Sequence, residues 1–287
     1  MKIGIGLPNP VRDTEGRVLV EWAKRAELAG FSGLVTIDRI AYPSYDSLAT
    51  LAAAAGATEQ IALMTNILLA PIYPPVLLAK SAASIDQISH GRFTLGMAVG
   101  GRSDDYEVAG KDFHHRGQDF DNALRVMHEV WGGLPLAQNS EPASPTPTRD
   151  HRVPILFGGT SEKTIERVVT WGAGWTAGGS QPAQSGPFAD GIRSAWSAAG
   201  RTGEPRLAAL TYFSLGEDAE EASVRYLLDY YGFLGDFATR IAESAHRSVS
   251  RVRDAAKAFE DAGFTELYFD PTVGRLDQVD RLAEAVL

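Results

Sequence analysis

Short strand-like runs alternate with longer helical patterns along the whole chain, and no other feature limits the possible folds as strongly. Residues 2–7 alternate up to a proline, and residues 18–29 then repeat apolar side chains at the spacing of one helical face. Alternating strands and helices form a parallel sheet with right-handed crossovers. Eight units without a break predict a closed (β/α)8 TIM barrel, whose chemistry lies at the C-terminal strand ends. The predicted strands are 2–7, 33–37, 60–68, 92–99, 153–157, 174–177, 206–215 and 265–270.

The whole chain is assigned to this one barrel. Its 287 residues would also fit two domains of about 150 residues each. The alternation resumes, however, directly after the Pro-, Ser- and Thr-rich segment 134–149, which we therefore interpret as an exposed loop. We expect a single domain over 1–287. The stretch 217–245 is longer than a plain crossover needs, so we expect a helical insertion after the seventh strand.

Charge and cysteine content exclude several functions. The chain has 27 Lys and Arg against 36 Asp and Glu, a net charge of −9, whereas nucleic-acid surfaces are basic. It has no cysteine, so a disulfide, a thiolate zinc site and a cysteine nucleophile are all impossible. No signal peptide is visible, and no apolar run approaches the about 20 residues that span a bilayer. We expect a cytoplasmic protein that binds neither nucleic acid nor membranes.

The predicted strand ends do not carry the groups of a metal enzyme or a Schiff-base enzyme. None of the six His residues and none of the six Lys residues lies at the C-terminal end of a predicted strand. We therefore expect no metal site and no lysine nucleophile. Asp38 and Asp270, which follow strands two and eight, could form a carboxylate pair for glycoside chemistry, but little else supports that interpretation.

Two Gly-rich strand ends point to a phosphate. Gly158, Gly159, Thr160 and Ser161 follow the fifth strand and open a helix, whose free N–H groups and dipole favour an anion. The alternative is a plain turn with a Ser or Thr N-cap. A second loop, Gly178-Gly179-Ser180, follows the next strand and lies beside the first. A chain with a phosphate cradle and no catalytic set of its own is expected to take its chemistry from a cofactor.

The chain resembles the luciferase-like monooxygenase family. The stretches PVLLAK at 75–80 and AASIDQIS at 82–89, followed by Gly-Arg at 91–92 and Leu-Gly at 95–96, are similar to the family's signature. Pro-Ile at 154–155 with the Gly-rich turn at 158–161 resembles the family's fifth-strand motif. The sequence GAGW at 172–175 is similar to its next motif.

This resemblance implies a (β/α)8 barrel with an insertion that binds FMN or the deazaflavin coenzyme F420. In the FMN branch, reduced FMN, often supplied by a separate flavin reductase, and oxygen oxidise the substrate. In the F420 branch, a hydride moves to or from the deazaflavin. We expect the first, with an F420-dependent dehydrogenase or reductase as the alternative and a non-catalytic flavin-binding protein as the second alternative. Homodimers are common in the family, so a homodimer is a possible state here.

The resemblance also assigns roles to single residues. Ser161 and Thr164 match the hydroxyls that hold the flavin phosphate, in the loop shaped by Gly158, Gly159 and Thr160. Thr65 and Asn66 match the end of the third strand, beside the isoalloxazine, where many members have a non-prolyl cis peptide. Among the predicted cofactor-binding residues are also Gly178 and Arg102.

Asp38 matches the Asp of the family's Asp-His dipeptide, and we assign it to catalysis together with Asn66 beside it. Its alternative is an ion pair with Arg39 or a helix N-cap, and for Arg102 the alternative is an exposed salt bridge. The sequence departs from the family at two places, because Arg39 and Pro74 replace the usual His residues. These departures leave the general base open.

The substrate is expected to be small and apolar or aromatic. The loops 102–116 and 216–245 are expected to shape its pocket, and they and neighbouring segments are rich in aromatic side chains, for which core packing is the alternative. These are Tyr42, Tyr45, Tyr106, Tyr212, Phe213, Tyr230, Tyr231 and Phe233.

Overall fold

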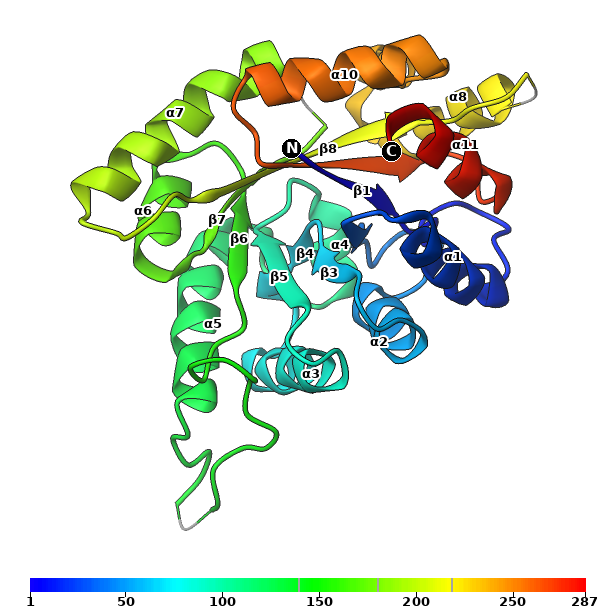
Figure 1. Ribbon diagram of the computed structural model, residues 1–287. Helices are drawn as coiled ribbons and strands as arrows, with labels where there is room; N and C mark the ends of the chain where they lie inside the picture. Colours follow the sequence, from blue (N-terminus) through cyan, green and yellow to red (C-terminus); the bar gives the residue numbers. More distant parts are fainter. Residues whose placement is uncertain (139, 180, 218) are drawn as a thin grey trace.

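A computed structural model describes residues 1–138, 140–179, 181–217 and 219–287, and it confirms the closed parallel barrel. The strands follow the order β3-β2-β1-β9-β8-β7-β6-β5-β4, and an additional pairing of β3 with β5 closes the ring (Figure 1). Every pairing is parallel. The strands are β1 (Lys2–Gly6), β2 (Gly33–Thr36), β3 (Ala62–Thr65), β4 (Leu68–Leu69), β5 (Phe93–Ala98), β6 (Ile155–Gly158), β7 (Gly174–Ala177), β8 (Arg206–Phe213) and β9 (Glu266–Pro271).

The third of the eight predicted strands is broken in two. We expected one strand over 60–68, but β3 ends at Thr65 and β4 begins at Leu68, with a cis peptide bond between Asn66 and Ile67. β3 pairs with β2 and β5, whereas β4 pairs with β5 alone. The break turns the backbone at the C-terminal mouth of the barrel.

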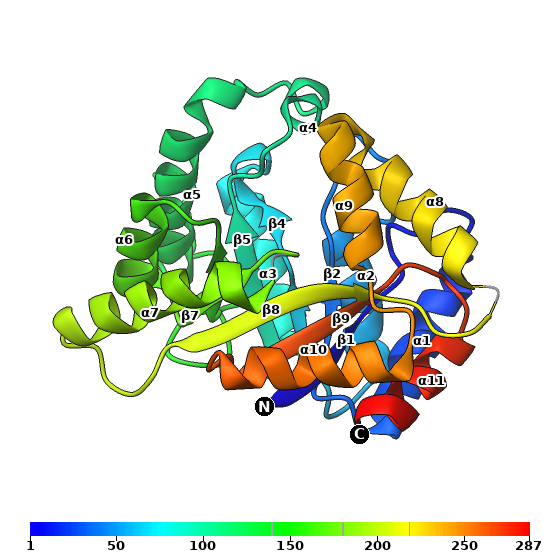
Figure 2. The same cartoon turned by 90° about the horizontal axis from the view of Figure 1, so that it is seen from above.

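Helices surround the barrel on its outside (Figures 1 and 2). They bury apolar faces against it, as in α3, where Leu78, Ala79, Ala82 and Ala83 are buried. The helices are α1 (Gly16–Ala29), α2 (Ser47–Ala57), α3 (Pro75–Ile88), α4 (Ser103–Val108), α5 (Arg116–Trp131), α6 (Glu162–Trp171), α7 (Pro182–Ala198), α8 (Ala219–Tyr231), α9 (Asp236–Ser244), α10 (Val249–Asp261) and α11 (Asp277–Val286), with short 3-10 turns η1 (Ala70–Ile72), η2 (Phe113–His115) and η3 (Gly232–Leu234).

Two helices differ from the sequence-based expectation. The helix α4 lies in a segment that we read as a loop, since six residues are too few for a clear helical period. The helix α7 begins at Pro182 rather than near residue 188, because Pro187 is tolerated in its second turn. The described residues of 134–149 form neither helix nor strand and protrude from the barrel below α5 (Figure 1).

Strand side chains divide into an outer and an inner layer. Ile5, Leu63 and Leu95 belong to the outer layer, which packs against the helices. Inside the barrel, Val35 packs with a cluster that includes Tyr268. The Tyr268 ring packs directly against the backbone of Gly4, where a side chain would not fit, since a Cβ on Gly4 would lie 2.4 Å from the ring.

The N-terminal end of the barrel is filled by a charged pair. Arg206 and Glu266, the first residues of the neighbouring strands β8 and β9, form two hydrogen bonds of 2.7 and 2.9 Å. Arg206 also donates to the Thr94 hydroxyl at 2.9 Å, and the Tyr268 hydroxyl donates to Glu266 at 2.9 Å. Polar side chains thus bridge three strands there, which leaves the opposite mouth open for a ligand. Among the described residues, no helix is long and apolar enough to cross a membrane.

Candidate active site

A cavity of about 240 Å³ lies at the C-terminal ends of the strands. Four residues that the sequence predicted separately line it together: Asp38, Asn66, Arg102 and Gly178. Most of the rest of the wall is apolar or aromatic, and it includes side chains from α8 and η3. The further lining residues are Ile37, Arg39, Ile67, Leu69, Gly101, Asp105, Gly179, Leu210, Tyr212, Tyr230, Tyr231 and Phe233.

Asn66 presents a hydrogen-bond donor without a partner. It precedes the cis peptide bond, which occurs where the family resemblance implies one. Its Oδ1 accepts a hydrogen bond from the Thr176 hydroxyl at 2.9 Å, which fixes the orientation of the amide. Its Nδ2 is buried and has no partner. Because an unpaired buried donor is costly, this N–H group suits an acceptor atom on a bound molecule.

Asp38 holds together the segment that follows the cis peptide. Its Oδ2 accepts from the backbone N–H of Leu69 at 2.9 Å, and the Tyr73 hydroxyl donates to both carboxylate oxygens at 3.0 and 3.1 Å. Burial raises the pKa of Asp38 to about 6, although these hydrogen bonds oppose the rise. A carboxyl group that titrates near neutral pH is suited to accepting or giving a proton.

Neither structural alternative for Asp38 holds. Arg39 does not pair with it, because Arg39 binds Asp105 and Asp104 at 2.7 and 3.2 Å. The N-cap of α2 is Asp46, whose side chain accepts from the backbone N–H of Ala49. Asp38 therefore forms no ion pair with Arg39 and does not cap α2, and its assignment to catalysis stays a prediction.

The raised pKa of Asp38 predicts a pH-dependent loss of stability. Unfolding returns the pKa from about 6 to 3.8, so the folded state holds the extra proton between these values and loses stability as pH rises through them. At 1.36 kcal/mol per pKa unit, the loss amounts to about 3 kcal/mol by pH 7. Urea unfolding between pH 4 and 7 should therefore show a weaker decline for Asp38→Asn than for the wild type. Asp46→Asn, at the exposed N-cap, removes a charge that helps to raise the pKa of Asp38, so its decline should be slightly weaker than that of the wild type but much stronger than that of Asp38→Asn.

Arg102 is held by neighbours of its own. Its guanidinium donates to Asp104 at 2.8 and 3.2 Å and to the Tyr230 carbonyl at 2.9 Å, and it lies 3.9 Å from the centre of the Phe233 ring. The salt-bridge alternative is present, although the pair is half-buried rather than exposed. A role of Arg102 toward a cofactor stays a prediction.

The predicted phosphate loop lies beside the cavity rather than in its wall. Ser161 caps α6, since its hydroxyl accepts from the Thr164 N–H at 3.3 Å and lies 3.2 Å from the Thr164 hydroxyl. Gly159 has φ +98°, and its carbonyl accepts from the Trp175 indole at 2.8 Å. Thr160 is exposed. Ser161 thus forms the N-cap of the alternative, and phosphate binding by this loop stays a prediction.

Of the remaining predicted residues, some reach the cavity and others do not. Gly158 touches the cavity indirectly, because a Cβ there would lie 3.2 Å from Ile67. Thr65 does not line it, and its hydroxyl donates instead to the Gly96 carbonyl at 2.8 Å. Gly178 is open, with nothing within 4 Å of a Cβ placed on it. Ser180 lies outside the described residues.

Sequence analysis missed the role of Tyr73 and did not predict how deeply two titratable groups outside the cavity wall, Asp270 and His246, are buried. Tyr73 stands next to Pro74, a position noted only for its lost His, yet its hydroxyl binds Asp38. Asp270 is fully buried without a hydrogen-bond partner, and burial raises its pKa well above the usual range. His246, expected away from strand ends, lies against β8, with its Nε2 3.0 Å from the Thr211 hydroxyl. Burial lowers the pKa of His246 to about 4.

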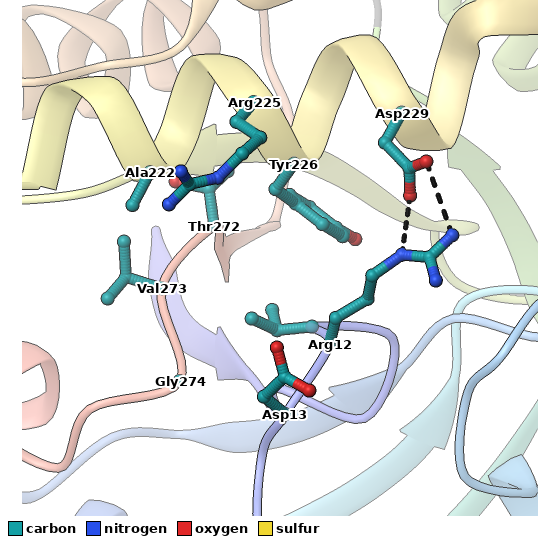
Figure 3. Close-up of a pocket in the computed structure, with 10 residues that line it drawn as sticks. Arg12, Asp13, Ala222, Arg225, Tyr226, Asp229, Thr272, Val273 and Gly274 are labelled. Carbon is teal, nitrogen blue, oxygen red and sulfur yellow. Dashed lines mark hydrogen bonds and ion pairs between the residues drawn. The ribbon is translucent and has the colours of Figure 1, made fainter.

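A second cavity of about 430 Å³ lies on another side of α8, between that helix and the loops after β1 and β9 (Figure 3). Arg12 and Asp229 form an ion pair at its edge, 2.8 Å apart. None of the predicted site residues lines it. Its size alone therefore does not make it the active site.

Comparison with known proteins gives related sequences and similar folds. An uncharacterized protein of Mycobacterium tuberculosis is 28% identical over 196 residues, which cover 59% of this chain and 68% of that protein. The oxygenase component of the flavin-dependent trigonelline monooxygenase of Acinetobacter baylyi is 36% identical over 81 residues, or 28% of this chain and 22% of that protein.

Solved structures match the fold over nearly the whole chain. Monooxygenase RslO1 from Streptomyces bottropensis has a TM-score of 0.80 at 20% identity and covers 99% of this chain and 97% of its own. An F420-dependent secondary alcohol dehydrogenase with an F420-acetone adduct reaches 0.79 at 19%, with 99% and 98% covered. The FMN complex of the oxygenating constituent of 3,6-diketocamphane monooxygenase from Pseudomonas putida reaches 0.74 at 15%, with 100% and 99% covered.

The family assignment rests on the sequence match. The luciferase-like monooxygenase family matches residues 1–286, which is nearly the full length. The barrel, the cis peptide after β3 and the cavity at the strand ends agree with that match. The chain therefore belongs to the luciferase-like monooxygenase family of flavin- or F420-dependent oxidoreductases.

Proposed function

We propose that this protein is a monooxygenase that uses reduced FMN and oxygen to oxidise a small apolar or aromatic compound. The observation that carries the proposal is the cavity at the strand ends, where a buried amide donor without a partner faces an aromatic wall beside a carboxyl group that titrates near neutral pH. The expected insertion 217–245 would shape the substrate side through α8 and η3, which contribute Tyr230, Tyr231 and Phe233 to the wall.

The residues present fit a flavin. The Asn66 Nδ2 would donate to an acceptor on the ring, and the open backbone at Gly178 leaves space beside it. Ser161, Thr164 and the first N–H groups of α6 would hold the phosphate, where the helix N-terminus favours negative charge. When bound and reduced, FMN supplies the electrons that activate oxygen.

The chain's own residues position the substrate and manage a proton. Tyr230, Tyr212 and Tyr231 line the cavity on the α8 side, where the hydroxyls of Tyr212 and Tyr231 are 2.6 Å apart, and these rings would help to keep water from a bound substrate. Asp38 would hold or accept a proton at its Oδ1 or Oδ2, while Tyr73 and the Leu69 N–H keep it in place. One relative's name describes an oxygenase component, and on that basis we infer a separate flavin reductase as partner.

Absorbance titration of the purified protein tests the cofactor. Addition of FMN should shift the flavin spectrum with saturation, whereas F420 should bind more weakly. The reverse order would favour an F420-dependent dehydrogenase or reductase. Saturable FMN binding without turnover of any member of a broad substrate panel would favour a non-catalytic flavin-binding protein.

The phosphate assignment predicts a loss of affinity in a double variant. Replacing Ser161 and Thr164 by Ala removes two hydrogen bonds to an anion, each worth about 1.5–3 kcal/mol, so FMN should bind at least about tenfold more weakly. Fluorescence titration measures this below the melting temperature, because the lost N-cap also costs about 1 kcal/mol of stability. Thr170→Ala, on the exposed end of the same helix, is the matched control. Equal affinity in the folded double variant would contradict the assignment.

A further inference from the structure

We propose that Arg39 determines substrate specificity, because its Nη1 donates a hydrogen bond to an oxygen atom of an uncharged, apolar substrate. This inference rests on the proposed function for the identity of the site. It assigns a binding role to the residue that replaces the family's usual His, and it names the class of substrate as one with a neutral oxygen acceptor, such as a carbonyl group.

The guanidinium of Arg39 has one end without a partner. Its Nε donates to Asp105 Oδ2 at 2.7 Å, and its Nη2 donates to Asp104 Oδ2 at 3.2 Å. The Nη1 is buried and has no partner, although the residue lines the cavity. Only 4% of the side chain is exposed. A buried donor left unpaired is costly, so this N–H group is matched to an acceptor that the chain itself does not provide.

Aromatic rings hold the guanidinium in place. The rings of Tyr42 and Tyr230 lie 5.6 Å from the Arg39 guanidinium carbon and pack edge to face, with their centres 5.0 Å apart. Asp105 is fixed in turn, because its Oδ1 accepts from the backbone N–H groups of Ile40 and Ala41 at 2.8 and 2.7 Å. The Nη1 is thus a donor of fixed position rather than a mobile surface charge.

The local charge favours a neutral acceptor over a carboxylate. Two cations, Arg39 and Arg102, are matched by two acids, Asp104 and Asp105. The nearby carboxyl of Asp38, with its pKa of about 6, adds negative charge above that pH. A substrate carboxylate would therefore enter a cavity that is already balanced or negative. A carbonyl oxygen takes the hydrogen bond without adding charge.

Arg39 cannot perform the proton transfer that an imidazole would. A guanidinium stays protonated in proteins and only donates hydrogen bonds. The replacement of His by Arg thus changes this position from a titrating group into a permanent donor. Asp38 lies in the same cavity wall, so binding by Arg39 and proton transfer by Asp38 would belong to separate side chains.

Matched probes test the proposal. Acetophenone, ethylbenzene and benzoate share one ring and differ in carrying a neutral oxygen, no oxygen or a carboxylate. Calorimetric titration of the wild type should show acetophenone bound at least about tenfold more tightly than ethylbenzene, the worth of one hydrogen bond to a charged group, and more tightly than benzoate. Equal or undetectable binding of the three probes, or strongest binding of benzoate, would overturn the proposal.

Substitutions assign the preference to Arg39. Arg39→Lys keeps a charge near Asp105 but removes the Nη1, so acetophenone should lose most of its advantage over ethylbenzene. Arg12→Lys is the matched control. Arg12 also lies over the Tyr42 ring, at 5.2 Å, but it lines the other cavity and pairs with Asp229 (Figure 3). An unchanged advantage in folded Arg39→Lys would overturn the proposal.

A third variant tests the charge balance without touching Arg39. Asp104 is 44% exposed on its side chain, so Asp104→Asn should fold, and it leaves one cation in the cavity unmatched. Benzoate should then gain on acetophenone by on the order of threefold. An unchanged ratio of the benzoate and acetophenone affinities would overturn the assignment of a neutral substrate. This test does not depend on whether Arg39→Lys folds.

The outcome is separable from that of the proposed function. All titrations are run on the protein alone and again with saturating FMN. Failure of the cofactor titration would remove the proposed monooxygenase, but the dependence of probe binding on Arg39 would still be measured on the protein alone. Loss of that dependence with intact FMN binding would remove only the inference about Arg39.

Discussion

Replacing Asp38 by Asn is expected to slow the chemical step by about 10²–10⁴, the usual worth of a positioned proton-transfer group, and to leave cofactor binding unchanged. Asn has nearly the same shape, and its Oδ1 can still accept from the Leu69 N–H. The amide cannot, however, take up a proton as the carboxylate does. Stopped-flow mixing of the reduced, cofactor-loaded protein with oxygen and an accepted substrate measures the step.

The pH profile separates proton transfer from a structural role. Since burial raises the pKa of Asp38 to about 6, a step that needs the carboxylate should speed up as pH rises through 6 and level off above it. The Asp38→Asn variant should lack that limb. Tyr73→Phe removes a hydrogen bond that holds the pKa of Asp38 down. The pKa should therefore rise, and the limb should shift to higher pH.

A matched carboxylate provides the control. Asp46 follows Asp38 closely in the sequence, but it caps α2 and does not line the cavity. Asp46→Asn keeps the cap, since Asn and Asp are equally good N-caps, and should leave the rate on the plateau above pH 6 unchanged, with at most a small shift of the limb to lower pH. Equal rates for Asp38→Asn and the wild type, or a loss of cofactor binding instead of rate, would remove Asp38 from the catalytic residues.

The sequence predicted the barrel and part of the site because both follow from the order of strands and helices along the chain. Strand ends of a parallel barrel meet at one mouth, so Asp38, Asn66, Arg102 and Gly178 had to lie near one another once the strands were identified. Nothing beyond the spacing of strands and helices was needed for that step. The break in the third strand was not predicted, because residues 60–68 read as one continuous strand; the family resemblance implied only the cis peptide bond there.

Partnerships between side chains could not be predicted in the same way. An ion pair with its sequence neighbour Arg39 was one alternative for Asp38, whereas in the fold Arg39 binds Asp105, 66 positions away on the short helix α4. Which acidic side chain a cation binds depends on how distant loops fold toward each other, and no periodic pattern in the sequence indicates that. Asp270 shows the same limit, because its lack of a partner follows from the packing of the whole barrel.

The two ends of the barrel differ in whether their polar side chains have hydrogen-bond partners. At the C-terminal mouth, Asn66 and Arg39 keep single donors without partners, which suits a bound molecule. At the N-terminal end, the polar groups of Arg206 and Glu266 bind each other and their neighbours. The first arrangement gives up stability for binding, and the second closes the barrel without leaving an open site.

Replacing Arg206 by Met is expected to lower the free energy of unfolding by about 3–5 kcal/mol, the usual cost of breaking one side of a buried ion pair. Glu266, only 6% exposed on its side chain, would keep a charge without its partner. Urea unfolding at pH 7 measures the loss. Burial by itself raises the pKa of Glu266, and the hydrogen bonds and charge of Arg206 reverse this and hold it below its ordinary value.

Two further measurements show whether the loss comes from that stranded charge. In Arg206→Met the pKa of Glu266 should rise above its unfolded value of 4.5, so the penalty should grow as pH rises through that value and shrink toward pH 4, where the carboxyl is protonated in both states. The double variant with both residues replaced by Met has no stranded charge and should regain most of the stability, since apolar replacements of buried pairs are often neutral or better. A double variant that is as unstable as the single one, or a loss independent of pH, would show instead that packing around Thr94 and Tyr268 sets the stability of this end of the barrel.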